Sequence, residues 1–180
     1  MTGGLPRVWG ATAAEVSARY GCDSALPRPG EAWFRAVTVR APARVMFRWL
    51  CQLKVAPYSY DLVDNLGRRS PQTLTPGADI LAPGQPVMTI FELVGFRAGE
   101  ELTLRMRSKA ALRLVGDIAI SYRVTEHEAG SCRLVDKLVL DADPTAVATC
   151  RRRALSWGDL AMMRKQLHTL RGLAEADQPG

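Results

Sequence analysis

The stretch of sequence that decides the fold is Leu160-Ala-Met-Met-Arg-Lys-Gln-Leu-His-Thr-Leu-Arg-Gly-Leu-Ala174. Its apolar side chains recur at alternating intervals of three and four residues, which places them on one face of a helix. We expect a closing helix of about 20 residues, followed by a polar tail. A helix with one long apolar face needs an apolar surface to cover. The residues of the stripe are Leu160, Met163, Leu167, Leu170 and Ala174.

The surface that this helix covers is expected to be an antiparallel sheet. Turn residues at 98–100 and 128–130 separate runs that have strand character and favour hairpins between them. One run alternates clearly, with Leu102 and Leu104 opposing Thr103 and Arg105, which is typical of a sheet with one covered and one wet face. The expected strands are 33–41, 87–97, 101–107, 118–126 and 132–140.

Three helices are expected before most of these strands. Thr12 and Glu15 form a capping-box pattern that opens a short helix over 12–20. Pro42 suits the first turn of a second helix, whose apolar residues from Val45 to Leu53 again follow a three-four spacing. A short third helix is expected within 56–67. Because strands are bracketed by helices with no βαβ alternation, the fold class is α+β.

Length and composition fit one domain, and they exclude several classes of protein. The 180 residues are 47% hydrophobic, so 1–180 is expected to be a single domain with an N-terminal extension at 1–31 and a core at 32–176. No apolar run is long enough to span a membrane. The N-terminus does not resemble a secretory signal, so a cytoplasmic location is expected.

Metal and nucleotide cofactors are not expected. Cys22, Cys51, Cys132 and Cys150 lie far apart, and His127 and His168 are the only histidines. No C-x-x-C pair, P-loop, G-x-G-x-x-G, G-x-S-x-G or H-E-x-x-H pattern occurs, so metal, nucleotide and covalent mechanisms are disfavoured.

The net charge of +6 leaves two interpretations open. One is a solvated basic surface. The other is an acidic partner such as a carrier protein, or an anionic surface, to which the arginine cluster at 151–153 could contribute. Nucleic acid is not expected, because no binding motif accompanies the charge and aromatic residues are not interleaved with it.

Several local motifs resemble those of the START-like superfamily, also called SRPBCC or Bet v 1-like, and its bacterial polyketide cyclase or dehydrase-like members. The resemblance covers nearly the whole chain, although it does not fix a reaction. The matching segments are Trp9-Gly-Ala-Thr12, Arg40-Ala-Pro42, Trp49-Leu50 with Gln52, Tyr58-Ser-Tyr-Asp61, Met162-Met-Arg-Lys-Gln-Leu167 and Leu173-Ala-Glu175.

The resemblance implies a helix-grip fold, in which a curved antiparallel sheet wraps around the long C-terminal helix and leaves a cavity between them. It implies that this cavity accepts a small hydrophobic molecule such as a lipid or polyketide. A non-covalent cyclase, aromatase or dehydratase acting in the same cavity is the alternative. A second alternative is an interaction protein whose interior is filled.

The candidate catalytic residues form a polar group after the second expected helix. A phenol, a carboxylate and a guanidinium together could support aldol cyclisation and dehydration, which requires at least two such groups to face the cavity. The same residues could instead cap helices and anchor loops. The candidates are Tyr58, Tyr60, Asp61 and Arg69.

The candidate ligand-binding residues are large, flexible or amphipathic side chains, which suit an adaptable apolar pocket but also an ordinary core. Asp159 is expected to cap the closing helix beside Trp157, unless that helix begins near Arg151 and contains Gly158. The candidates are Tyr58, Tyr60, Phe91, Phe96, Tyr122, Trp157, Met162, Met163, Gln166 and Leu167.

Overall fold

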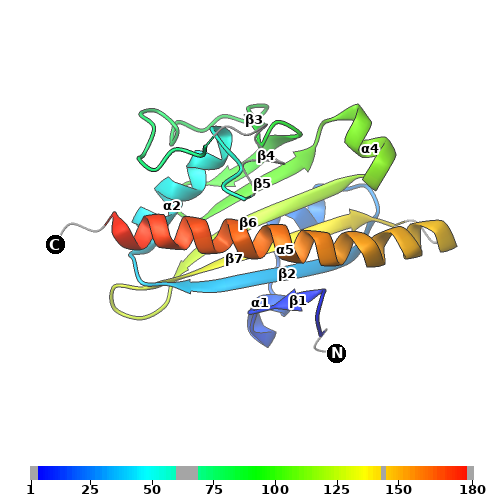
Figure 1. The fold of residues 1–180 in the computed structure, drawn as a ribbon, viewed down its shortest axis with the longest axis horizontal. Helices are drawn as coiled ribbons and strands as arrows, with labels where there is room; N and C mark the ends of the chain where they lie inside the picture. The colour runs from blue at the N-terminus through cyan, green and yellow to red at the C-terminus, as the bar shows by residue number, and fades with distance from the viewer. Residues whose placement is uncertain (1–3, 60–68, 143–144, 178–180) are drawn as a thin grey trace.

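The structure is a computed structural model that describes residues 4–59, 69–142 and 145–177. Helices and strands follow one another in the order of an α+β protein (Figure 1). The elements are β1 (Val8–Trp9), α1 (Ala13–Ser17), η1 (Gly21–Ser24), β2 (Pro29–Val39), α2 (Ala43–Cys51), η2 (Gln52–Lys54), β3 (Pro86–Val87), β4 (Phe91–Arg97), β5 (Glu101–Met106), α4 (Lys109–Val115), β6 (Ile118–Glu126), β7 (Cys132–Asp141) and α5 (Ala146–Ala176).

The strands of the described residues form a single sheet of seven strands in the order β1-β2-β7-β6-β5-β4-β3. Every neighbouring pair is antiparallel except β1 and β2, which are parallel. The expected hairpins between β4 and β5 and between β6 and β7 are confirmed. The parallel strand β1 is too short to have a sequence pattern of its own, and Gly10, which follows it, has a φ of +72°.

The helix α5 runs along the length of the sheet and covers one of its faces (Figure 1). The predicted apolar stripe is confirmed, because Leu160, Met163, Leu167, Leu170 and Ala174 are all buried. The helix begins at Ala146, however, and is longer than expected. Asp159 and Gly158 therefore lie well inside the helix, which agrees with the alternative of an early helix start, and the predicted cap at Asp159 is wrong.

The opposite face of the sheet is also partly covered, contrary to the expected wet face. Thr103 and Ser121 are buried there, together with the charged residues Glu101 and Lys137. The N-terminal segment covers this face. Its Cys22 is fully buried, and the backbone N–H of Cys22 donates to Ser121 Oγ at 2.9 Å. The sheet thus separates two layers of side chains, one under α5 and one under η1.

The local predictions for the helices have mixed outcomes. The capping box at Thr12 and Glu15 is confirmed, although α1 ends at Ser17. Pro42 is the residue before α2 and not within its first turn. The expected helix within 56–67 lies largely outside the described residues. The helix α4, which Ser108 caps through the backbone N–H of Ala111, was not predicted.

Candidate functional site

A cavity of about 790 Å³ lies between α5 and the sheet. Most of the side chains around it are apolar, and they come from five strands of the sheet, the helices α4 and α5 and the segments at 57–59 and 88–90. Strand alternation explains this lining, because every second residue of β6 and β7 points toward α5. The strand and helix residues of the lining include Trp33, Phe91, Met106, Val115, Ile118, Ile120, Tyr122, Leu138, Leu140, Leu155, Met162 and Met163.

Gln166 ties three parts of the cavity wall together. Its Oε1 accepts a hydrogen bond from the Tyr122 hydroxyl at 2.7 Å, and its Nε2 donates to the carbonyl oxygen of Pro57 at 2.6 Å. Gln166 and Tyr122 are both buried. These bonds fix α5 against β6 and against the segment that follows η2. They also satisfy the amide inside an apolar environment, where an unpaired polar group is costly.

A second polar group, formed by Asp159 and Arg35, connects α5 with the strand β2. Asp159 lines the cavity, and its Oδ2 lies 2.8 Å from Nη2 of Arg35, whose side chain is fully buried. Arg35 on β2 pairs in register with Asp136 on β7, which in turn pairs with Tyr122 on β6. The three side chains therefore stand in one row across the sheet, on the face beneath α5.

Asp136 is the least satisfied member of this group. It is 1% exposed, and among the described residues neither carboxylate oxygen has a hydrogen-bond partner. Burial and then the neighbouring Asp159 carboxylate raise the pKa of Asp136 well above its ordinary value, although Arg35 opposes the shift. Burial also raises the pKa of Asp159 to about 6, with Arg35 again opposing. One guanidinium therefore faces the buried carboxyl group of Asp136 and the largely buried one of Asp159.

Half of the ten predicted ligand-binding residues lie in the cavity wall. Because no ligand defines the site, their roles stay predictions. Two hydrogen-bond to each other, and Tyr122 also reaches Met163 Sδ at 3.9 Å. The five are Phe91, Tyr122, Met162, Met163 and Gln166.

Four other predicted residues lie outside the cavity wall. Tyr58 is buried and packs edge-to-face against Trp49 with ring centroids 6.4 Å apart, so it belongs to the core. Leu167 is fully buried in that core. Trp157 is 58% exposed, because its position on α5 lies outside the buried stripe of that helix. Phe96 lies near the β4–β5 turn and remains partly exposed.

The proposed catalytic cluster is not assembled in the cavity by its described members. Tyr58 does not line the cavity, and Arg69 is exposed and also absent from its wall. Tyr60 and Asp61 lie outside the described residues. Ser59 does line the cavity and is buried.

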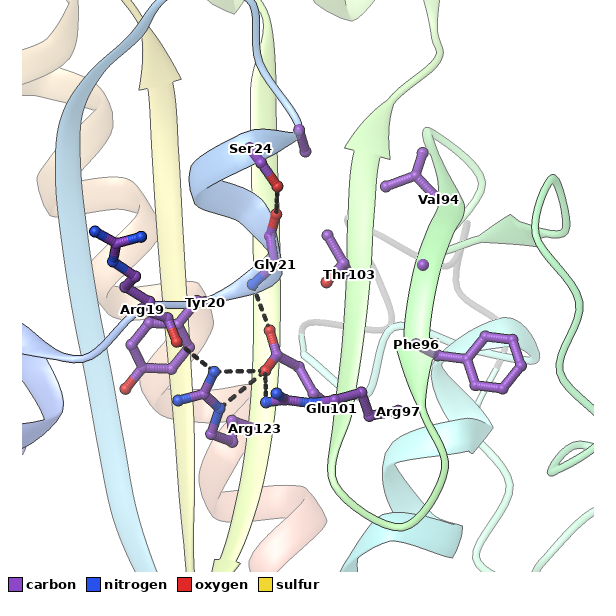
Figure 2. Close-up of a pocket in the computed structure, with 12 residues that line it drawn as sticks. Arg19, Tyr20, Gly21, Ser24, Val94, Phe96, Arg97, Glu101, Thr103 and Arg123 are labelled. Carbon is purple, nitrogen blue, oxygen red and sulfur yellow. Dashed lines mark hydrogen bonds and ion pairs between the residues drawn. The ribbon is translucent and has the colours of Figure 1, made fainter.

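A second hollow of about 550 Å³ lies on the other face of the sheet, beside η1 (Figure 2). Glu101 lies within it and accepts hydrogen bonds from Gly21 N, Arg97 and Arg123 over 2.6–2.9 Å. Burial opposes ionisation of this carboxyl, but the bonds from Gly21 and Arg123 lower the pKa of Glu101 below its ordinary value. Arg123 also lies 4.0 Å from the centroid of the Tyr20 ring. Glu101, its three hydrogen-bond donors Gly21, Arg97 and Arg123, and the Tyr20 ring form what we call the Glu101 group. This group joins the N-terminal segment to the sheet.

Arg35, Asp136 and the ion pair of Asp159 were not predicted from the sequence as features of the site. A signal was present, since Arg35 stands between Trp33 and Val37 at positions that alternate toward α5. Asp136 similarly stands between Leu134 and Leu138. Opposite charges at apolar positions of two strands predict a buried pair, provided that the two strands are known to be neighbours.

Neither a metal site nor a membrane span is found in the described part of the chain. No three histidine, cysteine, aspartate or glutamate side chains gather there in a way that could hold a metal ion. None of the helices described combines the length and the apolar character needed to cross a membrane.

No protein-family model matches the chain, and no curated protein matches its sequence. Solved structures do match its fold. Norcoclaurine synthase from Thalictrum flavum, solved with dopamine and hydroxybenzaldehyde, is 14% identical, with a TM-score of 0.53 over 83% of this chain and 89% of that chain. A protein from Thermobifida fusca is 14% identical, with a TM-score of 0.56 over 83% and 97% of the two chains.

A protein from Mesorhizobium loti is 12% identical, with a TM-score of 0.51 over 83% of this chain and 100% of that chain. At these identities the comparisons establish the fold and not the activity. The architecture agrees with this likeness, because the sheet packs against a long C-terminal helix and a cavity lies between them. The chain therefore has the helix-grip fold, which is also called the Bet v 1-like fold.

Proposed function

We propose that this protein binds a small hydrophobic molecule in the cavity between α5 and the sheet. The observation that carries the proposal is the cavity itself, which has a volume of about 790 Å³ and is lined mainly by apolar side chains. Ligand sites in proteins occupy about 300–1,000 Å³ and combine apolar walls with a few oriented polar groups. The Tyr122–Gln166 pair and Asp159 are such groups.

An unfilled space of this size between packed apolar side chains costs stability, and a bound apolar molecule would recover part of that cost. The side chains that surround the cavity also adapt readily, because Met88, Met106, Met162 and Met163 are unbranched thioethers. Such a wall can close on ligands of different shape. These features favour ligand binding over the interaction protein with a filled interior.

A non-covalent cyclase or dehydratase in the same cavity is less well supported. It required at least two of the polar residues from Tyr58 to Arg69 to face a ligand, and neither Tyr58 nor Arg69 lines the cavity. Tyr60 and Asp61 are outside the described residues, so their catalytic role stays a prediction. An acidic carrier protein as partner also stays a prediction.

The proposal is tested by filling the cavity from α5. Gly158 lines the cavity, and a Cβ built there would have no atom within 4 Å, so the first carbon of the leucine side chain in Gly158→Leu meets no other atom. Binding of the uncharged fluorophore N-phenyl-1-naphthylamine is measured by its emission. We expect Gly158→Leu to weaken binding about tenfold or more, because leucine occupies ligand space.

Gly172→Leu is the matched control, because Gly172 is on the same helix, outside the cavity wall, and also has no atom within 4 Å of a built Cβ. Both substitutions raise helix propensity by about 0.5–1 kcal/mol, so they affect the helix similarly. Native mass spectrometry of the protein before and after denaturation detects any retained compound. The proposal fails if the wild-type protein binds no probe and retains no compound.

A further inference from the structure

One ionisable side chain among the described residues of the cavity wall can carry a full charge at neutral pH, and it is Asp159. The cavity is otherwise lined by apolar groups and by neutral hydroxyl and amide groups. An isolated carboxylate in such a wall is costly because it has lost its water. Arg35 compensates part of that cost through the 2.8 Å contact with Asp159 Oδ2.

The single positive charge of Arg35 does not neutralise the carboxylates of both Asp136 and Asp159. Asp136 contributes a second carboxyl that is 1% exposed and has no hydrogen-bond partner among the described residues. The groups that face the two carboxyls are Arg35 on β2 and Tyr122 on β6, and Tyr122 is neutral because burial raises its pKa. With both carboxyls ionised, the group has a net charge of −1. With one proton bound, it is neutral.

We propose that the cavity is selective for an apolar molecule that carries one basic nitrogen, with the cation held against Asp159 and balanced by the second negative charge of Asp136. In the empty cavity a proton provides this balance. When the ligand's ammonium group lies beside Asp159, the proton leaves the carboxyl pair for the solvent, and the net charge of the group and ligand is again zero. The raised pKa values of both carboxyls are consistent with a proton held in the absence of ligand.

This inference rests on the proposed function, since it names the class of ligand for the same cavity. The test compares two probes of nearly equal size, 4-(2-naphthyl)butylamine and 4-(2-naphthyl)butan-1-ol. Their affinities are measured by isothermal titration calorimetry at about pH 7, in two buffers that differ in ionisation enthalpy. The difference in heat between the buffers gives the number of protons released on binding.

We expect the amine to bind at least about tenfold more tightly than the alcohol and to release up to one proton, with the preference growing as the pH rises. Asp159→Asn and Asp136→Asn should each remove most of the preference for the amine. Glu175→Gln should preserve it, because Glu175 lies on the same helix outside the cavity wall and contacts Arg40. Circular dichroism establishes that each variant is folded.

The outcomes separate the two ideas. If both probes bind equally and no proton is released, the cavity binds apolar molecules and the selectivity for a basic nitrogen is refuted. If neither probe binds the wild-type protein, ligand binding by this cavity is refuted as well. Should an aspartate variant fail to fold, the wild-type ratio of affinities and its proton count still decide between these results.

Discussion

Arg35 Nη2 on the strand β2 lies 2.8 Å from Asp159 Oδ2 in the middle of the helix α5, although 124 positions separate the two residues in sequence. The guanidinium also donates through Nη1 to the carbonyl oxygens of Arg7 and Phe34, at 2.8 and 2.9 Å. A single buried cation thus joins β2, the closing helix and the segment that leads into β1. Its removal should affect all three.

We expect Arg35→Met to lower the free energy of unfolding by about 3–5 kcal/mol at pH 8, because Asp136 and Asp159 would then be buried without a cation. The loss should shrink near pH 4, where both carboxyls are protonated. Urea denaturation at the two pH values measures the effect. Arg28→Met is the control, since Arg28 pairs with Asp141 at an exposed position, and a change of about 0.5 kcal/mol or less is expected there.

Asp136 should make the protein less stable as the pH rises. Its pKa is higher in the folded chain than in the unfolded chain, so between these two values the folded chain holds a proton that the unfolded chain has lost. Stability therefore falls as the pH rises from about 4 through the folded pKa. We expect Asp136→Asn to equal wild type near pH 4 and to exceed it by about 1–2 kcal/mol at pH 8.

Urea denaturation at several pH values tests this expectation. Asp141→Asn, at the end of the same strand, should show no such gain, because Asp141 is partly exposed and lies near Arg28. A gain for Asp136→Asn that is the same at all pH values would show that packing, and not the bound proton, limits stability at this site.

Much of the fold was predictable from the sequence because its signals are local and periodic. The strand Ile118–Glu126 has the bounds expected from its pattern, and the apolar stripe of α5 is buried as its spacing indicated. The start of α5 was not predictable, since Arg151 to Arg153 interrupt the apolar stripe although they lie within the helix. Trp157 was predicted to line the cavity, but its position around the axis of α5 makes it face outward.

The site was less predictable than the fold, because its polar groups meet only through tertiary contacts. Gln166 and Tyr122 were predicted as wall residues from their type, but their 2.7 Å hydrogen bond depends on how α5 crosses β6. The Arg35–Asp159 pair requires both the strand order and the helix phase. Phe96 was predicted as a wall residue from its type but lies outside the cavity wall. An aromatic residue on a strand near a hairpin turn need not face the interior.

The Glu101 group should stabilise the protein most above the acidic range. Because the pKa of Glu101 is lower in the folded chain, its contribution is present at neutral pH and is lost as the pH falls through the folded value. We expect Glu101→Gln to cost about 2–4 kcal/mol at pH 7 and less at low pH. Glu100→Gln is the matched control, because Glu100 pairs with the same Arg97 but its side chain is 46% exposed, against 4% for Glu101. Equal losses for the two variants would contradict this prediction.

Thr89 stores backbone strain at the edge of the cavity. Its φ of +64° is unfavourable for a β-branched residue, and Met88 beside it has a φ of +46°. We expect Thr89→Gly to raise the free energy of unfolding by about 1 kcal/mol, since glycine adopts this conformation without steric cost. Thr89→Ala retains most of the strain and should stabilise less. Thermal and urea denaturation of both variants distinguish backbone strain from a loss caused by the side chain.

The hydrogen bond from Tyr122 to Gln166 is expected to stabilise the packing of α5 against the sheet. Tyr122→Phe leaves Gln166 Oε1 buried without its donor, so we expect a loss of about 1–3 kcal/mol. Gln166→Leu removes that acceptor and also the donor to Pro57 O, so it should cost at least as much. In the double variant the phenol and its acceptor are both absent, and the combined loss should be smaller than the sum. Urea denaturation of the four proteins measures this coupling energy. Strictly additive losses would mean that the hydrogen bond does not hold the helix, and that Tyr122 and Gln166 act on stability only through their packing.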